Sequence, residues 1–190
     1  MTSMRIPPRS DREPQRLEAL REHGILDTDP ERSYDDLVEI ASYVAETPAA
    51  LITLVDEDRQ WVKAADGVPR SELPREISFC AHQISDPDEM LIVEDAREDP
   101  RFENNPLVED EPHIRFYAGQ PLRTEEGHVL GSLCVIDYEP RDLGEDQRTA
   151  LEALGRQASI NLDQRRERQR LEERIETLED QLEDSGLGRV

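Results

Sequence analysis

Cys80 and His82 are the residues whose types and spacing most directly suggest chemistry. On a helix, residues two apart point in different directions, so this pair makes a poor set of ligands for one metal ion. Cys134, the second of the two cysteines, lies far along the chain in an apolar stretch. A redox role requires an exposed thiol with a lowered pKa, whereas packing explains most buried cysteines. We therefore expect both thiols to act as core side chains, His82 to bind backbone, and the chain to have no metal, no cofactor and no catalytic activity.

Aromatic side chains form a second group of candidates. Aromatic residues make up only 4% of the chain, yet four of them lie between positions 79 and 117. This clustering indicates one shared location, which could line a ligand pocket or fill the core. With Cys80 and His82, the candidate pocket residues are therefore Phe79, Phe102, Phe116 and Tyr117.

Other catalytic patterns are missing from the sequence. It has no glycine-rich phosphate loop, no Gly-x-Ser-x-Gly elbow and no His-Glu-x-x-His helix. Asp95, Asp99 and Arg101 could form an acid/base group, but such side chains more simply hold a proline-containing loop by binding its backbone. These observations favour a binding or regulatory domain over an enzyme.

The charge of the chain excludes several partners. A net charge of −22 disfavours binding to nucleic acids and to anionic membranes, because both repel an acidic protein. Acidic residues are spread along the whole chain and Lys63 is its only lysine, a pattern that favours an acidic, halophilic protein over one with a single acidic partner surface. No apolar run approaches the about 20 residues of a membrane helix, and the N-terminus has no apolar signal segment. We expect a cytoplasmic protein.

Hydrophobic periodicity predicts the elements that position these residues. Asp29 and Pro30 indicate a helix start, with an N-cap carboxylate followed by proline in the first turn. Ser78 is expected to cap a short helix that carries Cys80 and His82. Predicted helices cover residues 14–23, 30–46, 79–84 and 144–184, and predicted strands cover residues 49–55, 60–65, 90–93, 114–123 and 129–136.

Seven short segments, in order, resemble GAF domains of bacterial and archaeal signalling proteins. They are residues 25–28 (ILDT), 78–82 (SFCAH), 93–96 (VEDA), 99–102 (DPRF), 105–108 (NPLV), 114–119 (IRFYAG) and 131–137 (GSLCVID). The resemblance covers about residues 16–162 and implies an α+β, GAF/PAS-like fold, with a central antiparallel sheet of five or six strands flanked by helices. It also implies a pocket on one face of the sheet, covered by about residues 68–113.

The sequence departs from two ligand-binding kinds of GAF domain. Members that carry a bilin have a cysteine directly followed by a histidine, whereas Ala81 separates Cys80 from His82 here. Members that bind cyclic nucleotides use a lysine-containing pattern that a chain with Lys63 as its only lysine cannot match. The resemblance therefore leaves the ligand an unknown small molecule.

The C-terminal region is predicted to be a signalling helix. We expect a flexible lead-in over residues 1–13, a GAF sensory domain over 14–162, and a coiled-coil helix with a disordered end over 163–190. An earlier apolar stripe at Leu151 and Ala158 is out of phase with the coiled-coil seam, so it is expected to pack on the domain. The seam, spaced four, three and four, predicts a parallel homodimer through Leu171, Ile175, Leu178 and Leu182.

The leading hypothesis is a sensory domain of prokaryotic signal transduction that binds a small molecule or relays a signal through this dimeric helix. Relatives of this kind usually precede a histidine kinase or a diguanylate cyclase. One alternative is a redox sensor, or a GAF-type methionine sulfoxide reductase, acting through Cys80. The other is a ligand-free interaction module that pairs with a histidine kinase.

Overall fold

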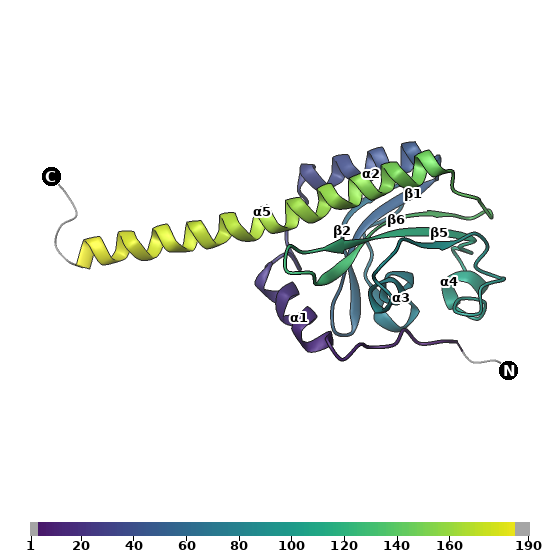
Figure 1. The fold of residues 1–190 in the computed structure, drawn as a ribbon, viewed down its shortest axis with the longest axis horizontal. Helices are drawn as coiled ribbons and strands as arrows, with labels where there is room; N and C mark the ends of the chain where they lie inside the picture. The colour runs from purple at the N-terminus through teal and green to yellow at the C-terminus, as the bar shows by residue number, and fades with distance from the viewer. Residues whose placement is uncertain (1–3, 185–190) are drawn as a thin grey trace.

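A six-stranded antiparallel sheet with helices on both faces forms the domain, and one long helix projects from it (Figure 1). The computed structural model describes residues 4–184, so the predicted disordered end and the first three residues of the lead-in lie outside it. The strands, in the order β3-β2-β1-β6-β5-β4, are β1 (Ala49–Val55), β2 (Arg59–Asp66), β3 (Leu73–Pro74), β4 (Leu91–Val93), β5 (Phe116–Arg123) and β6 (Val129–Asp137). The helices are α1 (Glu13–Glu22), α2 (Arg32–Ala45), the 3-10 turn η1 (Arg75–Ile77), α3 (Phe79–Ser85), α4 (Pro106–Glu109) and α5 (Glu145–Asp184). The predicted α+β class and its antiparallel sheet are confirmed.

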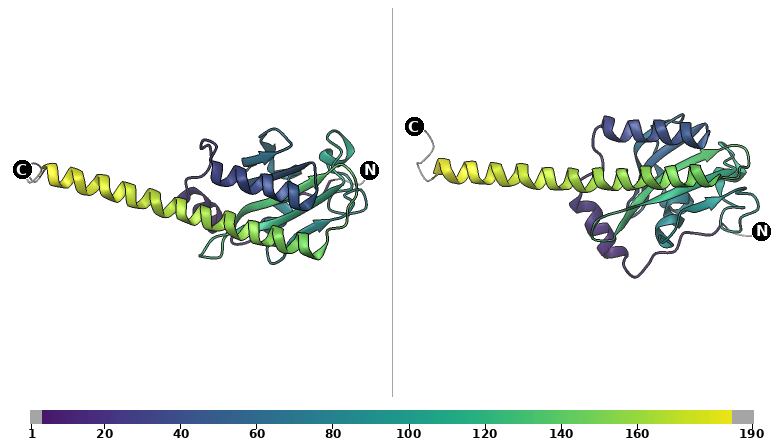
Figure 2. Two further views of the ribbon diagram at one scale, coloured as in Figure 1. Left: turned by 90° about the horizontal axis from the view of Figure 1, so that it is seen from above. Right: turned by 45° about the horizontal axis from the view of Figure 1, so that its top comes forward.

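The sheet separates two hydrophobic clusters. On one face α2 and α5 lie side by side over the strands (Figure 2), and their apolar residues form the larger cluster with Ile52, Leu133 and Val135. On the other face α3, α4 and the loops around them cover a second cluster, which includes Cys134 and Ile136. Residues 133–136 of β6 alternate between the two clusters, because successive side chains of a strand point to opposite faces. The stretch predicted to be the most apolar strand is therefore central, and it is buried along its whole length.

α2 begins at Arg32, two residues later than its sequence predicts. The cause is Lys63, whose Nζ donates to the Asp29 carbonyl and the Thr28 hydroxyl, both at 2.8 Å. These contacts hold residues 28–29 as a loop against β2, and the helix starts only after them. Lys63 Nζ also donates to Glu31 Oε1 at 2.7 Å, and its side chain is fully buried. Burial lowers the pKa of Lys63, and Glu31 opposes that shift.

Charged residues bind α5 to the domain at the point where the helix leaves the sheet. We call these contacts the helix anchor. Arg165 Nε donates to Glu31 Oε1 at 2.9 Å, so Glu31 is shared with Lys63. Arg166 binds Glu126 at 2.8 Å and Glu22 at 2.9 Å. Before the anchor, α5 is part of the core; beyond it, the helix projects into solvent (Figure 1).

The N-terminal segment is also held by the domain. From residue 4 onward, the expected flexible lead-in runs below α3 (Figure 1), where the Arg5 carbonyl lies 3.3 Å from His82 Nε2. Arg9 donates to the Glu57 carbonyl at 2.7 Å. The lead-in thus covers part of the face that carries the second cluster.

Glu13, at the start of α1, is a buried carboxylate that two buried arginines bind. Arg16 donates to it at 2.7 and 2.9 Å, and Arg75 of η1 also binds it. Burial alone would raise the pKa of Glu13, but the hydrogen bonds from Arg16 and Arg75 outweigh it and lower the pKa to about 2. This cluster links α1 to the segment that leads into α3.

Glu13→Gln is expected to lower the free energy of unfolding by about 2 kcal/mol near neutral pH, since glutamine keeps only part of the hydrogen bonding. A carboxylate with a depressed pKa stabilises the fold above its ordinary pKa of 4.5, and this contribution is lost as pH falls towards about 2. The difference between wild type and variant should therefore shrink over that interval, as measured by urea denaturation at stepped pH. Glu18→Gln, an exposed change in the same helix, is the control. A constant difference across the interval would contradict the assignment.

Candidate functional site

Local hydrogen bonds position α3 against the second face of the sheet. Ser78 Oγ accepts from the Ala81 N–H at 3.0 Å, which confirms the predicted cap, and donates to Gln60 Oε1 of β2 at 2.5 Å. Asn105 caps α4 and donates to the Ile77 carbonyl at 3.0 Å, joining the two covering helices. These bonds place the first residues of α3, Phe79 and Cys80, against the sheet.

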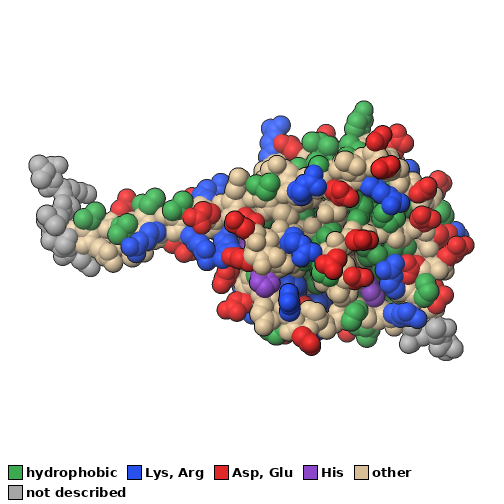
Figure 3. Space-filling model, in the orientation of Figure 1, with side chains coloured by type: hydrophobic (Ala, Val, Ile, Leu, Met, Phe, Trp, Pro, Cys, Tyr) green, Lys and Arg blue, Asp and Glu red, His purple; other side chains and the backbone are tan. Residues whose placement is uncertain are grey.

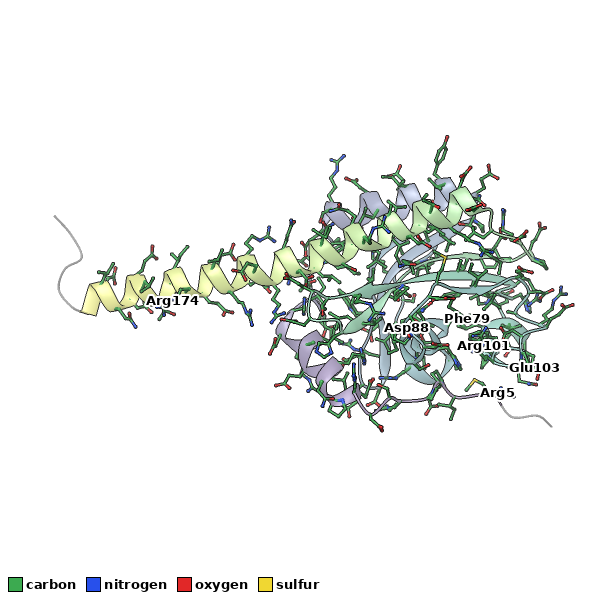
Figure 4. The ribbon with its side chains drawn as sticks, in the orientation of Figure 1. Arg5, Phe79, Asp88, Arg101, Glu103 and Arg174 are labelled. Atoms are coloured by element: carbon green, nitrogen blue, oxygen red, sulfur yellow. The ribbon has the colours of Figure 1, made fainter. Side chains whose placement is uncertain are left out.

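Three aromatic rings fill the space between α3, the α4 loop and β5, and we call them the aromatic cluster. Phe79 stacks on Phe102, with ring centroids 4.0 Å apart, and lies 5.2 Å from the Tyr117 ring. The His82 ring meets Phe102 edge-on at 4.9 Å. Figure 4 shows Phe79, the first residue of α3, near Arg101. These side chains come from three separate elements, and packing between them holds the covering segment onto the sheet.

Phe116 lies apart from the other candidate residues. It is buried in the larger cluster, on the face covered by α2 and α5, whereas its neighbour Tyr117 points into the aromatic cluster. The alternation of a strand causes this separation, which clustering in the sequence cannot reveal. The structure therefore brings five of the six candidates together: Phe79, Cys80, His82, Phe102 and Tyr117.

Cys134 is the residue of this site that sequence reasoning missed. Its Sγ lies 4.0 Å from Cys80 Sγ, and both thiols are free and buried. The Tyr117 hydroxyl donates to Cys80 Sγ at 3.3 Å and lies 3.3 Å from Ser132 Oγ. Alternation along β6 predicts that residues 132, 134 and 136 share one face, but not that α3 places Cys80 on that face.

Gly119 leaves room for the Tyr117 hydroxyl. A Cβ at position 119 would lie 2.2 Å from the Tyr117 oxygen, far inside van der Waals contact. The glycine thus allows the phenol to lie along β5 and reach Cys80. Burial raises the pKa of Tyr117, so its hydroxyl remains a proton donor.

A cavity of about 430 Å³ borders the aromatic cluster, and His82, Leu91 and Arg101 are among the residues that line it. Burial lowers the pKa of His82. Asp99 accepts from the backbone N–H of Arg101 at 2.9 Å, as the loop-holding interpretation predicts, and also from the Arg101 guanidinium at 2.6 Å. Among residues 4–184, no group of three or more His, Cys, Asp or Glu side chains could hold a metal ion. In the same part of the chain, no helix is both long and apolar enough to cross a membrane.

A curled antiparallel sheet, a short helix and loops over one face, and a long helix leaving from the other define an α+β domain of the GAF/PAS type. The sequence model of the GAF domain matches residues 29–162, more than half of the chain. The protein belongs to the GAF domain family.

Comparison with known proteins gives one curated relative and many structures with this fold. The chain is 44% identical over 138 residues to a cyclic di-GMP phosphodiesterase of Pseudomonas aeruginosa, and the match covers 73% of this chain but only 23% of that relative. The GAF domain of an Acinetobacter phosphoenolpyruvate-protein phosphotransferase matches with a TM-score of 0.58 and 21% identity, over 81% of this chain and 94% of that one. The blue-light absorbing form of the Thermosynechococcus elongatus PixJ GAF domain also gives 0.58, at 15% identity over 92% and 98%. At such identities the two structures share the fold alone.

Proposed function

We propose that this chain is a regulatory GAF domain that relays a signal through α5 to a partner and carries out no catalysis of its own. The observation that carries the proposal is the continuity of α5. One helix places Leu151 and Leu162 in the core and then extends beyond the helix anchor into solvent. A change of packing around the sheet can therefore reach the projecting end through a single stiff element.

An exposed apolar stripe on the projecting part of α5, the seam, supports pairing of two copies of the chain. Figure 3 shows hydrophobic side chains along this part of the helix. Ile160 is also exposed and lies eleven residues before Leu171, the first residue of the seam. Eleven residues make about three helical turns, so Ile160 lies on the same side of the helix as the seam. Large apolar residues aligned at this spacing are typical of a parallel two-stranded coil. The seam residues are Leu171 (55% exposed), Ile175 (55%), Leu178 (42%) and Leu182 (53%).

The domain itself offers a second contact for the partner copy. A cavity of about 590 Å³ lies between α5 and β5, and Pro121, Ser159 and Ile160 are among its lining residues. Four seam residues alone make a marginal coiled coil, because short isolated helices are weakly stable. In the proposed homodimer, contacts around Ile160 add to those of the seam.

We further propose a small-molecule ligand at the cavity beside His82 and Arg101, where binding would change the packing of α3. The relative named as a cyclic di-GMP phosphodiesterase contains the matched region as about a quarter of its length, which supports a regulatory region acting on a separate output part. A histidine kinase is the alternative partner to an output part of the kind found in that relative. The net charge of −22, spread along the chain, supports adaptation to high salt, so association is best measured there.

Replacing Ile175 and Leu178 by aspartate is expected to weaken self-association about 100-fold or more, because each dimer loses four buried apolar side chains. Sedimentation equilibrium in molar salt measures the change, since salt screens repulsion between acidic chains. The control is Thr177→Asp with Gln181→Asp, which adds the same charge at exposed positions off the seam. Equal masses for both variants, or a wild-type chain that stays monomeric at about 100 µM, where a dimer with a micromolar Kd is largely formed, would refute the proposed dimer.

A further inference from the structure

The two thiols lie in a geometry that suits reaction with each other. Cys80 at the start of α3 and Cys134 in the middle of β6 are the only cysteines of the chain, and their sulfurs are 4.0 Å apart. A disulfide has its sulfurs about 2 Å apart, so bonding requires the two atoms to approach by about a further 2 Å. α3 is a short helix between loops, so it can supply that movement more readily than the central strand β6.

Their surroundings give the two thiols different roles. Burial raises the pKa of Cys80, but hydrogen bonds offered by Cys134, Ser132 and neighbouring hydroxyls outweigh it and lower that pKa to about 6. The pKa of Cys134 is raised, chiefly by its hydrogen-bonding contact with Cys80 and then by burial. The Tyr117 hydroxyl donates to Cys80 Sγ at 3.3 Å, and such a donor stabilises a thiolate, so Cys80 suits the first attack and Cys134 the second.

We infer that Cys80 and Cys134 are a redox-active pair that hydrogen peroxide converts into an intramolecular disulfide and that thiols reduce again. The Cys80 thiolate attacks one peroxide oxygen, the O–O bond breaks, and Cys80 becomes a sulfenic acid as one water leaves. The first water is the displaced hydroxide with the proton of the Cys80 thiol. The Cys134 sulfur then attacks Cys80 Sγ, the S–O bond breaks, and the sulfenic hydroxyl leaves as a second water with the proton of the Cys134 thiol. In total, two thiols and one peroxide give one disulfide and two waters.

The cavity beside His82 brings solvent close to α3, although Cys80 itself is buried and is not among the residues that line it. It lies against α3 two residues from Cys80, and the N-terminal segment near Arg5 borders the same helix. Hydrogen peroxide is small enough to enter a protein interior of this kind, whereas bulky disulfides are excluded from buried sulfurs. The pair should therefore react with peroxide much faster than with oxidised glutathione.

The disulfide would fasten the covering helix to the strand beneath α5. Leu133 and Val135, which flank Cys134, lie in the cluster that contains the inner face of α5. Oxidation therefore acts on both faces of the sheet at once. The use of this bond as an input to α5 rests on the proposed function; formation of the bond does not, and it is tested separately below.

The full chain, reduced and then exposed to hydrogen peroxide, is expected to lose both titratable thiols and about 2 Da, the mass of two hydrogens, without covalent cross-links between chains. Peptide mapping without reductant should join the peptides of Cys80 and Cys134, and dithiothreitol should restore both thiols. Cys134→Ser should stop at a Cys80 sulfenic acid that dimedone traps. Retention of both thiols in native wild type, or cross-links only between chains, would overturn the inference.

Tyr117→Phe tests whether the Tyr117 hydroxyl assists oxidation of Cys80 or whether the tyrosine only packs against it. Without its hydroxyl, Cys80 loses one donor, so disulfide formation near neutral pH should become about tenfold slower. Tyr43→Phe is the matched control, because Tyr43 is 84% exposed on α2. Equal rates for both variants would show that the tyrosine does not assist Cys80 and would contradict the assigned roles. If oxidation proceeds as described but leaves the association of α5 unchanged, the proposed relay fails while the disulfide stands.

Discussion

Gly131→Ala is expected to destabilise the chain by about 4 kcal/mol or more, enough to prevent folding of a marginally stable domain. An added Cβ would lie 1.8 Å from the Thr53 carbonyl oxygen and 2.8 Å from the Leu54 Cα, both backbone atoms of β1. Neither can move without opening the ladder between β1 and β6, in which Gly131 faces Leu54. Circular dichroism with urea or thermal denaturation measures the loss.

Gly127→Ala provides the comparison for this prediction. Gly127 lies in the turn between β5 and β6 at a φ of +90°, with no atom within 4 Å of an added Cβ. Its replacement should cost about 1 kcal/mol, from backbone strain alone. Similar costs at both positions would mean that β1 and β6 approach less closely than described here.

Lys63→Ala is expected to lower the free energy of unfolding by about 3 kcal/mol, the lower end of the range for breaking a buried ion pair. Its removal leaves the Thr28 hydroxyl and the Asp29 carbonyl without their donor, while Glu31 keeps Arg165 and some contact with water. Urea denaturation measures the change. Because Glu31 also belongs to the helix anchor, faster hydrogen exchange at residues 163–166 should accompany it.

Arg174→Ala tests whether loss of any positive charge would lower the free energy of unfolding as Lys63→Ala does. Arg174 lies on the projecting part of α5, away from the domain (Figure 4), and is exposed. Its replacement changes the net charge as Lys63→Ala does but should alter stability by less than about 0.5 kcal/mol. If both variants lose the same stability, the effect comes from total charge instead of the buried contacts of Lys63.

Local patterns predicted most of the fold because the residues that decide these elements lie within them. Ser78 caps α3 through a group three residues away, and the apolar run of residues 129–136 is a central strand in any sheet that buries both faces. The start of α2 could not be predicted this way. Asp29 has the composition of an N-cap, yet Lys63 of β2, thirty-four positions along the chain, holds its carbonyl outside the helix.

The candidate site was predicted in part for a similar reason. Residue types placed Phe79, Cys80 and Tyr117 together, and the structure brings them into one cluster. They could not separate Phe116 from Tyr117, because that distinction depends on which face of β5 each residue occupies. The nearness of Cys134 to Cys80 depends in turn on how α3 crosses β6, a tertiary arrangement that one sequence does not contain.

The helix anchor holds α5 to the domain at residues 163–166 and the helix projects into solvent beyond them, so the helix is built like a lever with its pivot at these residues. Arg165 and Arg166 bind α1, the segment before α2 and the β5–β6 turn, so three parts of the domain hold the helix at this point. From there to residue 184 the arm is about 27 Å long, at 1.5 Å per residue, and a tilt of about 5° at the pivot moves its far end by roughly 2 Å. In the proposed homodimer, a shift of that size would change how the two projecting helices meet.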